Sequence, residues 1–245
     1  MVSPGWQGEM HGRLPELILQ SNRFIAGSIR NPWDWYVSVW AYGCDGKGAL
    51  YDRLTGSRKI LGHGYRKSLI HGMSNFLHEF RRSRLKWREV YSDSSSPDLF
   101  RRWLSFVMDP ENSRSLGENF YRSTLKQFAG LYTYRYCRLF HRTVTHLYDG
   151  SVSNKEALLR LDKQLNIVQH MMLVENLTDG ILELLERTGI NTDKEMRWKI
   201  KEMERTNPSS RNRDTAFYYD RQTVELVMQR DALIVDKYGY KPPEI

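Results

Sequence analysis

An arginine and a serine lie eight positions apart in the segment Arg30–Ser38, at a spacing that suits the binding of a phosphate group. Arg30 ends a short apolar run, and Ser38 falls about two turns into the helix expected after it. A guanidinium keeps its charge and matches phosphate oxygens with a planar fork, and a hydroxyl adds a donor. Ligands of open α/β sheets bind beyond the carboxyl ends of strands. The segment predicts a phosphate pocket; a strand-end ion pair for Arg30 and a surface role for Ser38 remain alternatives.

Elements on both sides of Arg30 would position this pocket. The run Arg23–Arg30 predicts a short buried strand, because its apolar residues are bounded by basic ones and a turn signal follows. Asn31 is a favourable N-cap, Pro32 suits the first helical position, and Asp34 suits the positive end of the helix dipole. A helix is therefore expected from this point to a stop at Gly43, and its N-terminus would favour an anion.

The remaining chain predicts mostly helices around a second strand. We expect helices at about 66–91, 98–108, 153–165, 178–188, 193–205 and 221–238, a strand at 166–174, and a turn segment followed by helix within 118–147. Residues 43–64 hold six glycines and predict a long loop, and 207–214 predict a polar loop. The order of elements favours an α/β protein with a small parallel sheet and abundant helical cover, forming one domain over 1–245 with an irregular segment at 1–22.

The sequence FIAGSIRNPWDWYVSVWAY resembles the donor-binding segment of sulfotransferases that use 3′-phosphoadenosine 5′-phosphosulfate (PAPS). That family pairs an apolar strand with Arg-x-Pro, a serine six positions after the proline, and an aromatic-rich helix. The resemblance implies a P-loop-NTPase-like sulfotransferase fold. It also implies that Arg30 and Ser38 contact the 3′-phosphate of PAPS, and that 43–150 form the acceptor side.

A second block near the C-terminus is similar to the same family. MMLVENLTDGILELLERTGI resembles its strand followed by Glu-x-Leu and a helix, and the segments 207–211 and 217–220 resemble its polar loop and Tyr-Tyr-Asp element. Together the two blocks cover about 20–45 and 166–241. In the polar loop, the side chains implied to close over the donor are Ser209, Ser210, Arg211 and Arg213; a solvated loop is the alternative.

One part of the family pattern is missing upstream of Arg23. Relatives hold the 5′-phosphosulfate in a strand–loop–helix with a Lys or Arg before Gly-Thr-like residues, whose backbone N–H groups cradle the anion. The segment Gly46–Gly48 is no substitute, because it follows a helix and lacks the Ser or Thr of a Walker motif. We therefore expect an N-terminally incomplete fold, which a fragment, a misplaced start codon or a lost loop would each explain.

Other residues could contribute to catalysis or to acceptor binding. His11 resembles a family histidine near the acceptor and would take a hydroxyl proton; a loop histidine without a role is the alternative. The other histidines lack metal-ligand spacing, so we predict no metal. The basic cluster between Arg81 and Arg88 could attract an anionic glycan acceptor or form a solvated face.

Composition leaves three hypotheses for function. The chain of 245 residues carries a formal net charge of +8, which indicates an anionic partner. Two cysteines and the lack of a signal-like or spanning segment favour a cytoplasmic setting without a membrane span. The leading hypothesis is transfer of a sulfuryl group from PAPS to a hydroxyl or amine of a carbohydrate or small molecule. The alternatives are an inactive module that binds PAPS or adenosine 3′,5′-bisphosphate, and a basic glycan- or nucleic-acid-binding protein. No nucleic-acid module is evident, so a nucleic-acid partner is not expected.

Overall fold

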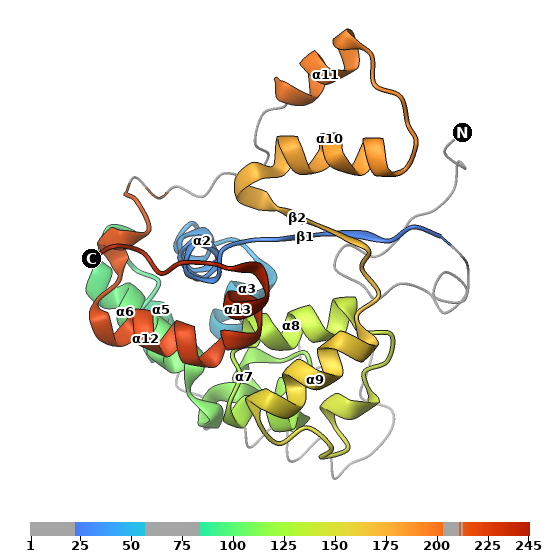
Figure 1. The fold of residues 1–245 in the computed structure, drawn as a ribbon. Coiled ribbons are helices and arrows are strands. Elements are labelled where there is room, and N and C mark those ends of the chain that lie inside the picture. Colours follow the sequence, from blue (N-terminus) through green and yellow to red (C-terminus); the bar gives the residue numbers. More distant parts are fainter. Residues whose placement is uncertain (1–22, 57–83, 203–210, 212) are drawn as a thin grey trace.

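The protein is a mixed α/β structure, mostly helical, built around a small parallel sheet. A computed structural model describes residues 23–56, 84–202, 211 and 213–245. Within these ranges the sheet has two strands, β1 (Ala26–Ile29) and β2 (His170–Leu173), in parallel register from Ala26 opposite His170 to Ile29 opposite Leu173. Figure 1 shows the sheet between the main helical body and a projecting helical pair.

Helices pack closely on both faces of the sheet. A Cβ added at Gly27 of β1 would lie 2.9 Å from the Phe140 ring of α8 (Leu131–Phe140). A Cβ added at Gly180 of α10 (Leu177–Arg187) would lie 3.0 Å from Met172 of β2. These glycines therefore allow one helix to approach each face, and α11 (Lys194–Lys201) lies beyond α10 in Figure 1.

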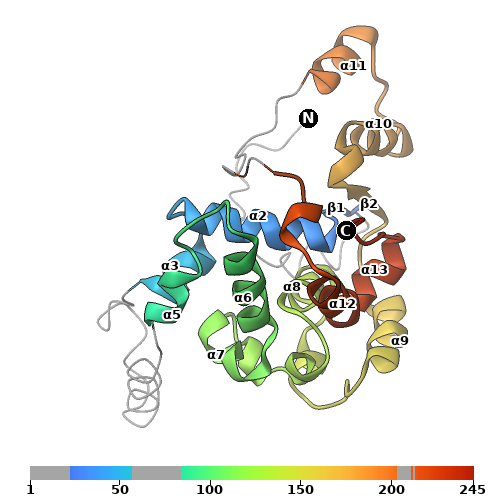
Figure 2. The same cartoon turned by 90° about the vertical axis from the view of Figure 1, so that its left-hand side faces the viewer.

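Helix α2 (Pro32–Cys44) leads from the sheet across the helical body, with α3 (Ala49–Thr55) at its far end (Figure 2). Asn31 caps α2, because its side-chain oxygen accepts from the backbone N–H of Trp33 at 3.0 Å. The other helices are α5 (Arg84–Glu89), α6 (Pro97–Met108), α7 (Ser113–Leu116), α9 (Lys155–Leu165), α12 (Arg221–Arg230) and α13 (Ala232–Tyr238). Short 3₁₀ turns cover Pro110–Asn112, Phe120–Arg122, Thr124–Gln127, Thr145–Leu147, Val174–Asn176 and Ala216–Tyr218.

Large aromatic side chains fill the core between α2, α6 and α12. Trp33 and Trp40 of α2 are fully buried, and each still satisfies its indole N–H: Trp33 donates to the Val224 carbonyl at 3.2 Å and Trp40 to the Val90 carbonyl at 2.7 Å. These contacts fix α2 against elements from the middle and the end of the chain. The first turn of α2 is thereby held at the carboxyl end of β1.

A buried carboxylate, Asp231, joins α2 to α8 and α13. It accepts hydrogen bonds from the Tyr36 hydroxyl at 2.7 Å and from the backbone N–H and hydroxyl of Thr133 at 2.8 and 2.7 Å. Burial raises its pKa, and the hydrogen bonds from Thr133 and Tyr36 oppose that rise. Gly130 lies directly beneath it, where an added Cβ would come within 2.6 Å of the carboxylate.

Two sequence-based expectations are wrong. The segment 43–64, expected to be a loop, contains α3, because Leu50 and Leu54 lie one turn apart and both bury in the core. The expected continuous helix 221–238 divides into α12 and α13 at Asp231. At this break the backbone carbonyl of Arg230 accepts a hydrogen bond from the backbone N–H of Gly130 at 2.7 Å. In a continuous helix the same carbonyl would accept from an N–H of the next turn.

Smaller differences concern the ends of elements. Both strands are shorter than expected, α2 continues to Cys44, and α10 begins at Leu177, so Thr178 lies inside the helix that it was expected to cap. Of the helix expected at 66–91, the structure describes α5; residues 57–83, like 1–22, lie outside the described residues. Among the described residues, none of the helices combines the length and the apolar character that a membrane span needs.

Candidate functional site

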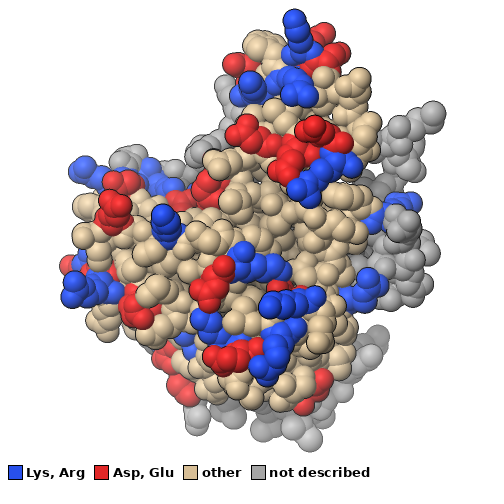
Figure 3. All heavy atoms as spheres, in the orientation of Figure 1, with Lys and Arg blue, Asp and Glu red and all other residues tan. Residues whose placement is uncertain are grey.

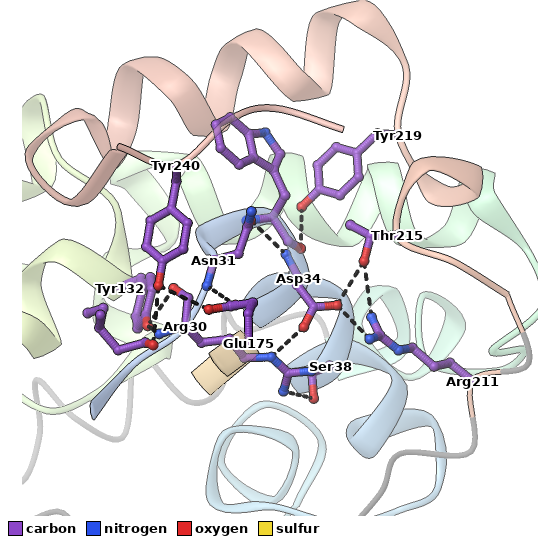
Figure 4. Close-up of polar contacts among 12 residues, drawn as sticks. Arg30, Asn31, Asp34, Ser38, Tyr132, Glu175, Arg211, Thr215, Tyr219 and Tyr240 are labelled. Carbon is purple, nitrogen blue, oxygen red and sulfur yellow. Dashed lines mark hydrogen bonds and ion pairs between the residues drawn. The ribbon is translucent and has the colours of Figure 1, made fainter. Parts of the chain in front are cut away.

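The two side chains predicted to hold a phosphate lie next to each other. Arg30 follows the last residue of β1, and its Nη1 donates to the Ser38 hydroxyl at 3.0 Å across the first two turns of α2 (Figure 4). The Arg30 side chain is 27% exposed. The charge is therefore held at the carboxyl end of the parallel strand and remains open to solvent, as a bound anion requires.

Asp34 connects Arg30 to the polar loop that precedes the C-terminal helices. One carboxylate oxygen pairs with Arg30 Nε, and the other pairs with Arg211 Nη2 at 2.5 Å (Figure 4). Thr215 donates its hydroxyl to the same oxygen as Arg211, at 2.8 Å. Arg30 and Arg211, predicted from separate sequence blocks, therefore meet on a single carboxylate.

The site brings charges of both signs together. Arg30 and Arg211 carry two positive charges, Asp34 carries one negative charge, and the Glu175 carboxylate lies beside the same turn. Burial opposes ionisation of Asp34, but Arg30, the Thr215 hydroxyl and Arg211 hold its pKa below the usual value. The carboxylate stays ionised near neutral pH and orients both guanidiniums. Ser38 and the two guanidiniums form a set of donors suited to a phosphate.

The backbone at Arg30 and Asn31 is fixed by side chains from distant segments. The Tyr132 hydroxyl accepts from the Arg30 N–H at 2.9 Å and donates to the Arg30 carbonyl at 3.1 Å. Glu175, just after β2, accepts from the Asn31 N–H at 2.6 Å and from the Tyr240 hydroxyl at 3.3 Å (Figure 4). Three segments thus hold the turn from β1 into α2, which sets the direction of the arginine.

The structure places the other predicted residues in different ways. Arg213 lies over the Phe217 ring at 5.5 Å, and no contact joins it to Arg30 among the described residues. Ser209, Ser210 and His11 lie outside the described residues. In the basic cluster between Arg81 and Arg88, Lys86 donates a hydrogen bond to the Asn112 side-chain oxygen at 3.0 Å.

Thr215 and Tyr132 were not predicted as site residues. Thr215 sits 181 residues from Asp34, and Tyr132 sits 102 residues from Arg30. Neither belongs to a local motif, because each reaches the site through tertiary packing. The cluster of tyrosines in 131–136 was a visible signal, and it lies in the segment 118–147, for which only a turn and a helix were expected.

A second polar group lies buried between α8, α9 and α13, away from Arg30. His141 lies between two partners, with Nε2 3.0 Å from Asp162 Oδ1 and Nδ1 3.0 Å from His146 Nε2. Lys237 pairs with the other oxygen of Asp162 at 2.5 Å. Burial opposes ionisation of Asp162, but hydrogen bonds from His141 and Lys237 lower its pKa to about 2. His141 and Asp162 are almost fully buried, so these two side chains offer no accessible site.

Neither site resembles a metal centre. Among residues 23–56, 84–202, 211 and 213–245, no three His, Cys, Asp or Glu side chains are grouped as metal ligands. No protein-family model matches the chain, and comparisons with curated proteins and with solved structures find no match either.

Proposed function

We propose that the chain binds the 3′-phosphate of PAPS through Arg30, Ser38 and Arg211 and transfers its sulfuryl group to a hydroxyl or amine. The observation that carries this proposal is the convergence of Arg30 and Ser38 at the carboxyl end of β1. Arg211 adds a second guanidinium on the same carboxylate. The resemblance of both sequence blocks to PAPS-dependent sulfotransferases supplies the identity of the anion.

In the proposed reaction the acceptor oxygen or nitrogen attacks the sulfur of PAPS. The new bond to sulfur forms as the bond between sulfur and the bridging phosphate oxygen breaks, and adenosine 3′,5′-bisphosphate leaves with that oxygen. The acceptor proton passes to a base, for which His11 is the proposed residue. Arg30 and Ser38 would hold the 3′-phosphate and so fix the position of the sulfur.

The test is calorimetric titration with adenosine 3′,5′-bisphosphate and, separately, with adenosine 5′-phosphate, which lacks the 3′-phosphate. A hydrogen bond to a charged group contributes about 1.5–3 kcal/mol, so Arg30→Ala is expected to weaken binding of the bisphosphate about 10- to 150-fold. Ser38→Ala is expected to weaken it several-fold. Neither change alters the affinity for the 5′-phosphate to the same extent, because the lost contacts are to the 3′-phosphate.

Two further variants control for loss of charge and loss of folding. Arg102→Ala removes an exposed arginine that pairs with Glu89 at 2.8 Å, and it is expected to leave binding unchanged. Arg30→Lys keeps the charge but not the fork, and is expected to recover part of the affinity. If Arg30→Ala folds and still prefers the bisphosphate as strongly as the unaltered chain, the proposal is wrong.

A second candidate function is nucleotide binding without transfer. The contacts of Arg30, Ser38 and Arg211 account for the binding of a phosphate and not for displacement at sulfur. Incubation with ³⁵S-labelled PAPS and a set of hydroxyl and amine acceptors separates the two functions. Labelled product supports transfer, whereas bisphosphate binding that depends on Arg30 with no labelled product supports the second function.

A further inference from the structure

A second cluster of arginines lies close to the proposed donor site and is anchored by one carboxylate. Glu118 Oε1 pairs with Arg135 Nη2 at 2.6 Å, and Glu118 Oε2 pairs with Arg138 Nη1 at 3.1 Å. Arg53 of α3 also reaches Oε1, at 3.3 Å, and donates to the Leu116 carbonyl at 2.7 Å. Guanidiniums from α3 and α8 therefore converge on one side chain.

Positive charge exceeds negative charge in this cluster. Arg135 and Arg138 alone outweigh the single charge of Glu118, and like charges held this close repel each other. Burial opposes ionisation of Glu118, but Arg135, Arg53 and Arg138 keep its pKa below the usual value. Glu118 is therefore ionised, and its single negative charge does not balance the charges of the arginines. A further anion would relieve the remaining repulsion.

The cluster is accessible and has unused donors. The side chains of Arg135 and Arg138 are 25% and 34% exposed. Among the described residues, Arg138 uses only Nη1 in a hydrogen bond, which leaves the N–H groups on Nε and Nη2 for a ligand. Glu118 is 19% exposed and holds both guanidiniums in place before any ligand arrives, which lowers the cost of binding.

Two aromatic rings link this cluster to the donor site. The guanidinium of Arg135 lies 5.5 Å from the centre of the Trp35 ring, and that ring stacks on Tyr132 at 4.3 Å and 10°. Tyr132 in turn binds the Arg30 backbone. Trp35 follows Asp34 on α2, while Tyr132, Arg135 and Arg138 follow one another at steps of three residues on α8, about 4.5 Å each along the axis.

The face that Figure 3 displays does not provide a comparable field. On the face that Figure 3 displays, Lys and Arg side chains are interspersed with Asp and Glu, so no single sign of charge covers it. A ligand that responds to the net charge of +8 alone would have no preferred place on this face. The Glu118 cluster offers a defined geometry instead.

We infer that Arg135 and Arg138, held by Glu118, form a binding site for an oxyanion group of the acceptor, either a sulfate, a phosphate or a carboxylate. This inference rests on the proposed function in one respect. A ligand bound at this cluster would be an acceptor because PAPS binds beside it, at Arg30. The anion site itself depends only on the cluster. An acceptor with an anionic group would be held by that group beside the donor.

The test uses calorimetry at constant ionic strength with two probes, a sulfated heparin-derived tetrasaccharide and inorganic pyrophosphate. Arg138→Gln and Arg135→Gln are expected to weaken tetrasaccharide binding at least tenfold, since each removes a charged donor. The matched control is Arg102→Gln, which removes the same charge from an exposed arginine paired with a single glutamate. It is expected to change binding less than twofold. Arg138→Lys keeps the charge and is expected to fall between Arg138→Gln and the unaltered chain.

Each outcome decides the inference. Equal losses in Arg102→Gln and Arg138→Gln would show attraction by diffuse charge and overturn it, as would failure of both probes to bind. Pyrophosphate binding that depends on Arg138, without tetrasaccharide binding, supports the anion site with a small anion as its ligand. Arg30→Ala separates the two proposals, because it is expected to weaken bisphosphate binding about 10- to 150-fold and to leave tetrasaccharide binding intact. If the unaltered chain binds tetrasaccharide through Arg138 but never binds bisphosphate, the donor proposal alone fails.

Discussion

The buried pair His141 and His146 predicts a specific loss of stability in mild acid. His141 lies between Asp162 and His146, with its Nε2 3.0 Å from Asp162 Oδ1 and its Nδ1 3.0 Å from His146 Nε2. His146 meets this buried chain only through Nε2, so its Nδ1 lies outside the chain. This nitrogen is buried and has no hydrogen-bond partner among the described residues. Protonating it would create a buried charge whose new N–H finds no acceptor there.

The structure gives the sign and size of the effect. Burial, followed by the neighbouring His141, lowers the pKa of His146 from its usual 6.5 to about 4, although Asp149 acts in the opposite direction. Between pH 6.5 and pH 4, His146 is protonated in the unfolded chain and neutral in the folded chain. Stability is therefore complete above about pH 6.5 and falls as the pH drops toward 4. At 1.36 kcal/mol per pKa unit, the total loss is about 3 kcal/mol.

Urea unfolding followed by tryptophan fluorescence, repeated from pH 7.5 to 4.5, measures this loss. Asp162 does not interfere, because its pKa of about 2 places its own contribution below about pH 4. His146→Gln retains an amide N–H that can donate to His141 but cannot titrate. The slope of the unfolding free energy against pH should therefore be smaller in His146→Gln than in the unaltered chain. The difference corresponds to one bound proton, or about 1.4 kcal/mol per pH unit at most. Equal slopes for the variant and the unaltered chain would refute the assignment of the buried uncharged nitrogen.

Two further predictions concern the support of the site. Asp231→Ala leaves the Tyr36 hydroxyl and both Thr133 donors without their buried acceptor, so the free energy of unfolding in urea is expected to fall by about 3–5 kcal/mol. Asp231→Asn, which keeps one carbonyl oxygen, is expected to cost less, and an alanine variant as stable as the unaltered chain would contradict the role of this carboxylate. Asp220→Ala removes the capping box with Thr223 at the start of α12 and is expected to cost about 1 kcal/mol, or about 2–4 °C in Tm. An unchanged melting curve by circular dichroism would show that α12 does not depend on this cap.

Local signals predicted the start of the site well. Asn31 caps α2 and Pro32 occupies its first turn, because capping depends on a few neighbouring residues that the sequence displays directly. The spacing of Arg30 and Ser38 likewise translates into adjacency, since the helix itself sets it. The small parallel sheet was also expected, and β1 and β2 confirm it.

Tertiary contacts account for what the sequence did not predict. Asp34 was interpreted as a dipole-favoured residue, whereas in the structure it joins two arginines from opposite ends of the chain. Glycines at 43–64 indicated a loop, but burial of Leu50 and Leu54 outweighs that local preference. The break at Asp231 likewise depends on partners about 100 or more residues away, for which no local pattern exists.

The parallel pairing of β1 with β2 has a consequence for how the molecule is made. The Asn31 N–H finds its acceptor 144 residues later, and no short turn links the two strands. Such non-local pairing slows folding, because a long loop must close before its contacts repay the lost entropy. During synthesis the arginine emerges from the ribosome long before Glu175 and Arg211 do. An mRNA truncated before the codons of β2 would therefore yield a polypeptide that contains Arg30–Asp34 but lacks Glu175 and Arg211, which hold this segment in the folded chain.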